Sequence, residues 1–213
     1  MSTPLTLTEY YRWFHREWMR AGLVVAVFLL IYLTVLVAPT NLALYAMLLC
    51  APLYMLHETE EYLFPGGFAQ FANRDLYQQD PEQGLTDETA VFWINMGYIW
   101  LPLPVCGLLA AYDLRFAAWM PYFLIFQALV HVLLSVAARR WYNPGLLTAL
   151  FLHVPFAVWA IHLLQAAGVL QNVWFNGYLV MGFLFILGLP VMGFFLMKRY
   201  RKRIAPHGSA VQE

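Results

Sequence analysis

A short run of ionisable side chains, HETEE at positions 57–61, ends a long apolar stretch of the sequence. Positions 41–56 carry no charge, and residues 62–64 are apolar again before a proline and two glycines at 65–67. Proline and glycine in succession are strong signals for the end of a helix. The run is therefore predicted to occupy the last turns of a membrane helix, where ionisable groups are costly and mark functional sites.

The spacing within this run is that of one half of a metal site. His57 is followed by Glu60 and Glu61 at three and four positions, the spacing found on the helices of zinc proteases and of di-iron bundles. Tyr54, His57, Glu58 and Glu61 are expected to share a helix face, with Glu60 beside it. Because three neighbouring carboxylates repel one another, a divalent cation bound by carboxylates and neutral imidazoles would stabilise them.

The composition defines the surroundings of this run. Hydrophobic residues make up 62% of the 213 positions and charged residues 11%, against about 25% in soluble domains. The sequence is therefore expected to form one all-α polytopic domain in a lipid bilayer. No basic block interleaved with aromatics occurs outside the termini, which argues against nucleic-acid binding.

Six apolar runs, each near the ~20 residues that a membrane span requires, follow an amphipathic segment at residues 1–20. The predicted spans are 21–37, 41–64, 86–111, 116–138, 144–167 and 173–197, and a basic tail occupies 198–213. The 65–85 connection is long enough to be either a lid or a plain solvated connector.

The distribution of basic residues predicts the orientation. Of the 12 lysines and arginines, all except Arg115 fall at the termini or in the connections on the side of the termini. The positive-inside rule therefore places both termini, and the end of the second span, in the cytoplasm. The expected location is the inner membrane of a bacterium.

Polar side chains on three further spans are predicted at the depth of His57. At ~1.5 Å per residue, His57 lies about 10 Å from the cytoplasmic end of its helix, His131 about 12 Å, and Asn95 and His153 about 13 Å. We expect these residues to meet in the bundle and to hold a metal ion. The predicted ligands are His57, Glu58, Glu60, Glu61, His131 and His153. The alternative is that the run is an interfacial helix end and the histidines form hydrogen bonds between helices.

The motif H-x-x-E-E resembles that of the HXXEE-motif family of uncharacterised bacterial membrane proteins. The Tyr-Asn-Pro-Gly sequence at 142–145, together with His131 and His153, is similar to other landmarks of that family. The resemblance implies an integral membrane protein, and it implies no activity. The second histidine of the zinc-protease pattern H-x-x-E-H is missing, so protease chemistry is not transferred.

The favoured hypothesis is a metal-dependent hydrolase acting on a lipid or lipophilic substrate near the cytoplasmic leaflet. Zinc is the favoured ion, and iron or manganese are alternatives. Glu60 or Glu61 would complete the ligand set or act as general base, and Asn95 or Tyr98 would stabilise negative charge. The alternatives are a di-iron oxidase or hydroxylase, a proton- or cation-coupled transporter, and a structural membrane protein. The sequence does not define the oligomeric state.

Overall fold

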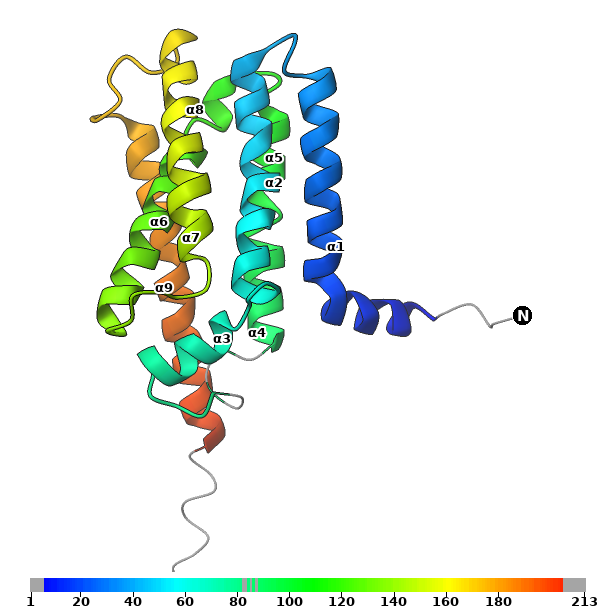
Figure 1. The fold of residues 1–213 in the computed structure, drawn as a ribbon, viewed down its shortest axis with the longest axis vertical. Coiled ribbons are helices and arrows are strands. Elements are labelled where there is room, and N and C mark those ends of the chain that lie inside the picture. The colour runs from blue at the N-terminus through cyan, green and yellow to red at the C-terminus, as the bar shows by residue number, and fades with distance from the viewer. Residues whose placement is uncertain (1–5, 82–83, 85, 87, 205–213) are drawn as a thin grey trace, which may run out of the picture.

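The computed structural model describes residues 6–81, 84, 86 and 88–204, and its architecture is a bundle of long helices (Figure 1). No strand occurs among these residues. Six helical segments of the described chain are long and apolar enough to cross a membrane. The predicted all-α polytopic class is thus confirmed, and the chain is an integral membrane protein. Residues 1–5 of the predicted amphipathic segment and 205–213 of the predicted tail lie outside the described residues.

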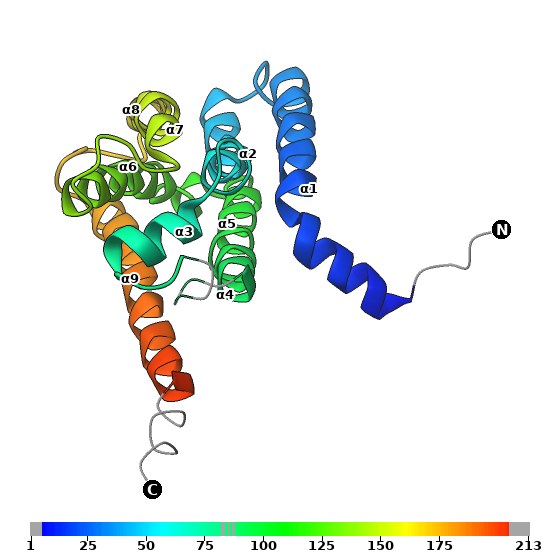
Figure 2. The same ribbon diagram turned by 60° about the horizontal axis from the view of Figure 1, so that its bottom comes forward.

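Helix α1 (Leu7–Leu36) joins the predicted amphipathic segment and the first span without a break. Its start is fixed by a capping box, in which the Thr6 side chain accepts from the Glu9 backbone and the Glu9 carboxylate accepts from Thr6. The N-terminal turns bend away from the bundle in both ribbon views (Figures 1 and 2). The rest of α1 packs along α2.

Helix α2 (Leu42–Tyr62) forms the centre of the bundle. It contacts α1, α5 (Pro102–Leu109), α6 (Met120–Ala137) and α8 (Val154–Ala166), and it is the most buried of the six candidate spans. Its N-terminus is capped by the Asn41 side chain. The HETEE run therefore lies inside the protein and not on its lipid-facing surface.

Two of the candidate spans change from α- to π-helix near the level of the run. The third consists of α4 (Glu88–Trp93), the π-helical η2 (Ile94–Ile99) and α5, and the fifth consists of α7 (Leu146–Thr148), the π-helical η4 (Ala149–His153) and α8. The prolines at 102 and 155 lack the N–H that would continue a regular α-helix. This missing donor explains why the backbone hydrogen-bond pattern changes just before each of them. Such π segments are frequent at functional sites.

The last span, α9 (Gly177–Ile204), packs against α6, which follows the short 3-10 turn η3 (Leu114–Phe116). The contact is close at Gly182, where an added Cβ would lie 2.8 Å from the backbone nitrogen of Phe123. Only a residue without a side chain permits this approach. The Tyr98 hydroxyl on η2 donates to the Phe185 carbonyl of α9 and so connects the third and last spans.

The long connection after α2 contains two short helical segments, α3 (Phe68–Phe71) and the π-helical η1 (Ala72–Leu76). They cross the end of the bundle between α2 and α9 (Figures 1 and 2). The Asn73 side chain holds this connection by donating to the carbonyls of Pro81 and Thr86 and accepting from the Thr86 N–H. The described part of the connection thus covers the end of the bundle where the HETEE run lies.

Candidate metal centre

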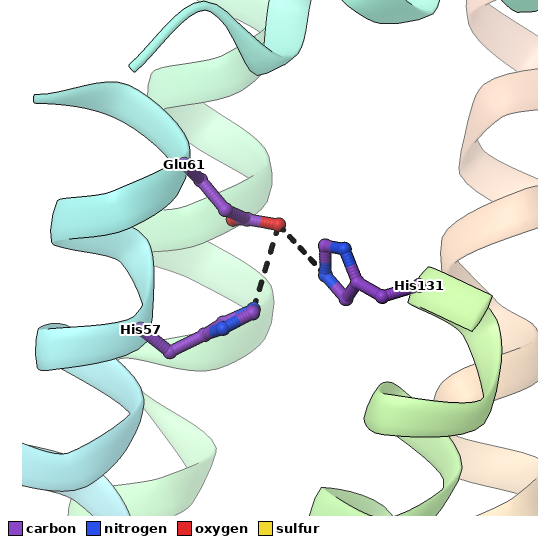
Figure 3. Close-up of side chains that lie close together, drawn as sticks. All are labelled: His57, Glu61 and His131. Carbon is purple, nitrogen blue, oxygen red and sulfur yellow. Dashed lines mark ion pairs between the residues drawn. The ribbon is translucent and has the colours of Figure 1, made fainter. Parts of the chain in front are cut away.

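His57 and Glu61 of α2 meet His131 of α6 in the interior of the bundle (Figure 3). The Glu61 Oε1 atom lies 3.5 Å from His57 Nε2 and 3.2 Å from His131 Nε2. One ligand atom from each of the three residues lies within 4.8 Å of the others. Within the described part of the chain, this group has the composition and the separation needed to surround a metal ion.

Two of the three separations suit a tetrahedral ion. With metal–ligand bonds of about 2.0–2.1 Å, two ligand atoms at tetrahedral positions are about 3.3 Å apart. The two carboxylate–imidazole distances of 3.5 and 3.2 Å are close to this value. Both imidazoles are fully buried and Glu61 is nearly so, which means that bulk water does not solvate the carboxylate.

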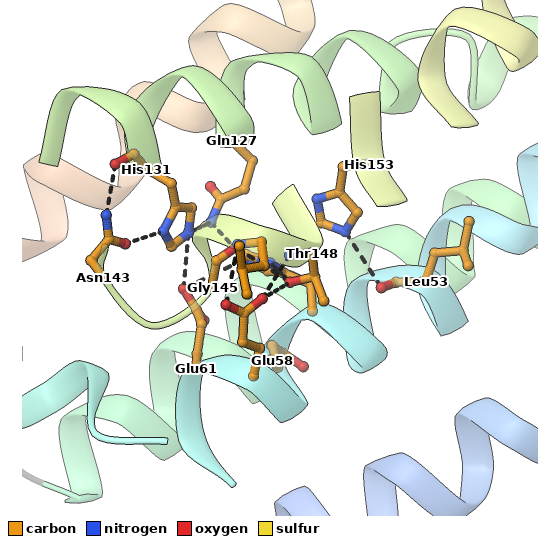
Figure 4. A network of polar contacts seen from close by, with 12 residues as sticks. Leu53, Glu58, Glu61, Gln127, His131, Asn143, Gly145, Thr148 and His153 are labelled. Atoms are coloured by element: carbon orange, nitrogen blue, oxygen red, sulfur yellow. Dashed lines mark hydrogen bonds and ion pairs between the residues drawn. The ribbon is translucent and has the colours of Figure 1, made fainter. Parts of the chain in front are cut away.

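The hydrogen-bond network assigns the hydrogen on His131 (Figure 4). The Asn143 amide nitrogen donates to the His131 carbonyl and to Ser135 Oγ, each at 2.8 Å. The Asn143 Oδ1 atom therefore accepts from His131 Nδ1 at 2.6 Å. His131 thus carries its hydrogen on Nδ1 and turns the lone pair of Nε2 toward Glu61.

The Thr148 hydroxyl determines which nitrogen of His57 carries the hydrogen. The Thr148 hydroxyl donates to Glu60 Oε2 at 2.6 Å, so its oxygen accepts from His57 Nδ1 at 2.9 Å. The Nε2 lone pair of His57 then also points toward Glu61. Oxygen acceptors behind the Nδ1 atoms of both rings are the usual supports of metal-ligating histidines.

Two lone pairs and a carboxylate oxygen therefore face one another in a dry site. If one of the two Nε2 atoms carried a proton, only one of the two contacts with Glu61 would be a hydrogen bond. Protons on both would leave two imidazolium ions beside a single carboxylate, with a net positive charge in the membrane interior. A divalent cation between the three groups would stabilise all of them together.

The Gln127 side chain supplies a fourth group at this point. Its amide nitrogen lies 3.3 Å from His57 Nε2 and 3.2 Å from His131 Nε2, and its oxygen is buried without a partner. Half a turn of the amide exchanges the two atoms and directs the oxygen toward the same centre. Gln127 can thus serve the three residues both as a hydrogen-bond donor and as a neutral oxygen ligand.

The backbone at Gly145 forms the wall behind the cluster. An added Cβ would lie 2.5 Å from His131 Cε1, 2.8 Å from Glu61 Cγ and 2.9 Å from His57 Cε1. The residue also has φ +98°, a conformation that side chains disfavour. Glycine is required at this position both by its backbone conformation and by its contact with all three candidate ligands.

The remaining acidic residues of the run have other partners. Glu60 accepts from the backbone N–H groups of Leu147 and Thr148, from the Thr148 hydroxyl and from the Tyr142 hydroxyl. It therefore caps the start of the fifth span and orients His57 through Thr148. This arrangement differs from the expected role as ligand or base.

Glu58 lies on a different side of α2 from Glu61. Its Oε2 atom accepts from Trp100 Nε1 at 2.5 Å, and its Oε1 atom is buried without a partner. At ~100° per residue, Glu61 is only about 40° around the helix from His57, whereas Glu58 is about 100° away. The expected shared face therefore includes Glu61 and leaves Glu58 outside the cluster.

His153 and Asn95 lie next to the cluster. The ring centroids of His153 and His57 are 4.6 Å apart. His153 Nε2 lies 3.4 Å from the Leu53 carbonyl, away from Glu61 (Figure 4). Asn95 donates to the Val91 carbonyl and lines the cavity described below. His153 is outside the group of three whose ligand atoms converge.

The sequence did not predict three components of the site, namely Thr148, Trp100 and the backbone at Gly145. Thr148 lies 91 positions from His57 in the sequence and Trp100 lies 42 from Glu58. No local pattern marks such contacts. A buried imidazole and a buried carboxylate each require a hydrogen-bond partner. This requirement of His57 and Glu58 was the signal that could have indicated Thr148 and Trp100.

A cavity of about 390 Å³ adjoins the cluster. Glu61, His131, Gln127 and Asn95 lie on its wall, and most of its other lining side chains are apolar. The residues come from α2, α4, η2, α6 and α9 and from the connection containing α3 and η1. The candidate metal centre is thus open to an apolar space within the bundle.

The fold and the cluster together define an integral membrane protein with a buried histidine–glutamate site. A family model described as a protein of unknown function with HXXEE motif matches residues 47–160, which is more than half of the 213 residues. The chain belongs to this HXXEE-motif family. No curated protein and no solved structure matches the chain significantly.

Proposed function

We propose that this protein is a metal-dependent membrane enzyme that binds one ion, with zinc favoured, through His57, Glu61 and His131. The observation that supports it most strongly is the meeting of two imidazole lone pairs and a carboxylate oxygen at 3.2 and 3.5 Å in a buried site. Two histidines and one glutamate are a known ligand set of catalytic zinc sites, which keep a fourth position open.

We assign hydrolysis of a lipophilic substrate to this site. In zinc sites of this composition the ion activates water and polarises carbonyl or phosphoryl groups. The chain itself would orient His131 through Asn143 and His57 through Thr148 and Glu60. Asn95, on the wall of the adjoining cavity, would stabilise developing negative charge with its amide.

The contacts of Glu58 and Glu60 favour one ion over two. A di-iron centre needs carboxylates that bridge both ions. Glu58 accepts a hydrogen bond from Trp100, and Glu60 accepts hydrogen bonds from the fifth span, and neither belongs to the group whose ligand atoms converge. We further propose, from the distribution of lysine and arginine, that both termini face the cytoplasm of a bacterial cell and that the site serves the inner leaflet of its membrane.

Elemental analysis of detergent-purified protein tests the metal site. We expect about one equivalent of zinc in the wild-type protein, from the ligand set, and background levels in H57A, H131A and E61Q. His162→Ala is the matched control, because His162 is an exposed histidine of α8. A wild-type protein without transition metal, or full occupancy in H131A, contradicts the proposal.

The enzymatic part is tested with the zinc-loaded protein in nanodiscs made from a bacterial polar lipid extract. We expect the wild-type protein to release hydrolysed lipid that mass spectrometry detects, and H131A and E61Q to release none. Equal lipid profiles for wild-type protein and H131A would reject the assignment to hydrolysis.

A further inference from the structure

We propose that the substrate is an amphiphile with a single hydrocarbon chain, which enters the cavity sideways from the membrane and lies along α6 and α9. Its polar group would be at Glu61 and His131. This inference rests on the proposed function, since it assigns the substrate of that same site. It follows from the distribution of polarity in the cavity, from the place where the cavity meets the surface, and from its size.

The acidic, amide and imidazole side chains of the cavity wall are Glu61, Asn95, Gln127 and His131, which belong to the candidate metal centre or lie next to it. Four residues with hydroxyl groups, Tyr54, Tyr62, Tyr77 and Thr86, also line the cavity. The wall formed by α6 and α9 is apolar and consists of Val130, Leu133, Leu134, Leu189, Pro190 and Gly193. An occupant that matches this division has one polar end and one hydrocarbon end.

The cavity reaches the surface on the side of α6 and α9. Leu133 lines the cavity and is nevertheless 55% exposed, and Pro190 on α9 is also exposed. Both lie in segments that are apolar enough to cross a membrane, so this part of the surface faces lipid. At the end of the bundle, Phe68 of α3 and Ala72 and Leu76 of η1 cover the cavity. A hydrophobic ligand therefore reaches the site from the bilayer.

The volume limits the number of chains. A cavity of about 390 Å³ lies at the low end of the ~300–1,000 Å³ range of small-molecule sites. A lipid with two long chains would have to leave one chain outside, against the surface of α6 and α9. The limited space therefore favours lysolipids or other hydrolysable compounds with one chain as substrates, and fatty acids as their products.

Photo-crosslinking in phosphatidylcholine nanodiscs tests this assignment. The first probe is palmitic acid with a diazirine in its chain and a terminal alkyne, and the second is a phosphatidylcholine that carries the same modified chain beside an ordinary one. We expect the fatty-acid probe to label peptides with the cavity residues of α6 and α9. The two-chain probe should label only lipid-facing residues outside the cavity.

Two variants fill the cavity at different places. If one of them fails to fold, the other still tests the proposal. Leu189→Trp enlarges a lining side chain, and Gly193→Leu adds one at a position where a Cβ would lie 3.4 Å from the Tyr77 hydroxyl. Each should reduce cavity labelling at least about tenfold. Leu184→Trp is the control, since Leu184 lies on the same helix and is 61% exposed.

Three results would overturn the inference: no cavity labelling by the fatty-acid probe, equal cavity labelling by both probes, or labelling of L189W and G193L at the level of L184W. Metal content measured on the same samples separates this inference from the proposed function. Labelling without bound metal supports the chain site and rejects the metal enzyme. Bound metal without labelling supports the metal site and rejects the single-chain substrate.

Discussion

Each imidazole in the candidate metal centre has its ring orientation determined by a residue that does not belong to the HETEE run. Asn143 accepts from His131 Nδ1, and Thr148 accepts from His57 Nδ1 while donating to Glu60. In the neutral rings, these contacts place the hydrogen on Nδ1 and direct the two Nε2 atoms at Glu61. The ligand character of the histidines therefore depends on neighbours that bind no ion themselves.

Thr148→Val tests this dependence. Valine keeps the shape of threonine but removes the hydroxyl between His57 and Glu60, so His57 loses its fixed orientation. We expect metal affinity to fall about 10- to 100-fold, the usual effect of losing such a support. Competition with a zinc-binding dye measures the affinity.

Thr59→Val is the control for this experiment, because the Thr59 hydroxyl donates only within α2, to the Met55 carbonyl. It should leave the affinity unchanged. If T148V binds zinc as tightly as the wild-type protein, Thr148 does not position His57.

Gly145→Ala separates backbone strain from contact with the ligands. The methyl group would overlap His131, Glu61 and His57, so we expect the bound metal to be lost. Gly168→Ala is the control, since Gly168 also has positive φ (+73°) but has no atom within 4 Å of an added Cβ. Both variants should lose about 1–2 kcal/mol of stability from the left-handed conformation. Thermal unfolding and metal analysis distinguish them, and a metal-loaded G145A would show that the contact is unimportant.

Among the elements, the connection formed by α3 and η1 determines how the cavity is closed toward the end of the bundle. Asp75 on η1 pairs with Arg74 at 2.9 Å and with Arg140 at 3.2 Å, and Arg140 follows α6. The second pair attaches the cover to the segment that also carries Asn143 and Gly145. A movement of the cover would therefore be coupled to the support of the metal centre.

Arg140→Gln should loosen this attachment. The expected effect is small, because ion pairs of this kind contribute ~0–1 kcal/mol. We expect faster hydrogen exchange of the backbone amides at residues 68–77, measured by mass spectrometry. Arg139→Gln removes a neighbouring charge of the same sign and is the control. Equal exchange in R140Q and the wild-type protein would mean that the pair does not hold the cover.

The pH dependence of this attachment follows from Asp75. The guanidinium of Arg74, and that of Arg140, hold the pKa of the Asp75 carboxyl below its ordinary value. A carboxylate with a lowered pKa stabilises the folded state above its ordinary pKa of about 3.9 and loses this effect as the pH falls through the lowered value. The ratio of the protection factors of wild-type protein and R140Q, which removes the intrinsic pH dependence of amide exchange, should therefore be equal at pH 7 and pH 5 and approach one in more acidic solution.

At the scale of the whole molecule, the sequence predicted the class of fold and the meeting of His57 and His131 from two different helices. Long apolar runs bounded by proline, glycine and charge are sufficient to predict membrane helices. The equal depths of His57 and His131 followed from the helical rise alone. These predictions succeeded because they need only distances along a single helix axis.

The parts that the sequence did not predict depend on rotation about the helix axis and on distant contacts. Depth alone does not show that Glu58 faces Trp100 or that Glu60 caps the fifth span. The π segments at η2 and η4 add a further local rotation just where Asn95 and His153 lie. Such rotations are determined by the packing of all neighbouring helices together.

The position of Gly145 against the three candidate ligands has a consequence for biogenesis. The pocket for the ion is complete only after the second span, the fourth span and the turn before the fifth have docked, because each contributes one side of it. A nascent chain that has inserted only its first half has no such pocket. If the site binds an ion as proposed, its capture would mark the docking of these three segments, before the last span joins them, and a cell starved of metal would accumulate inserted but loosely associated helices.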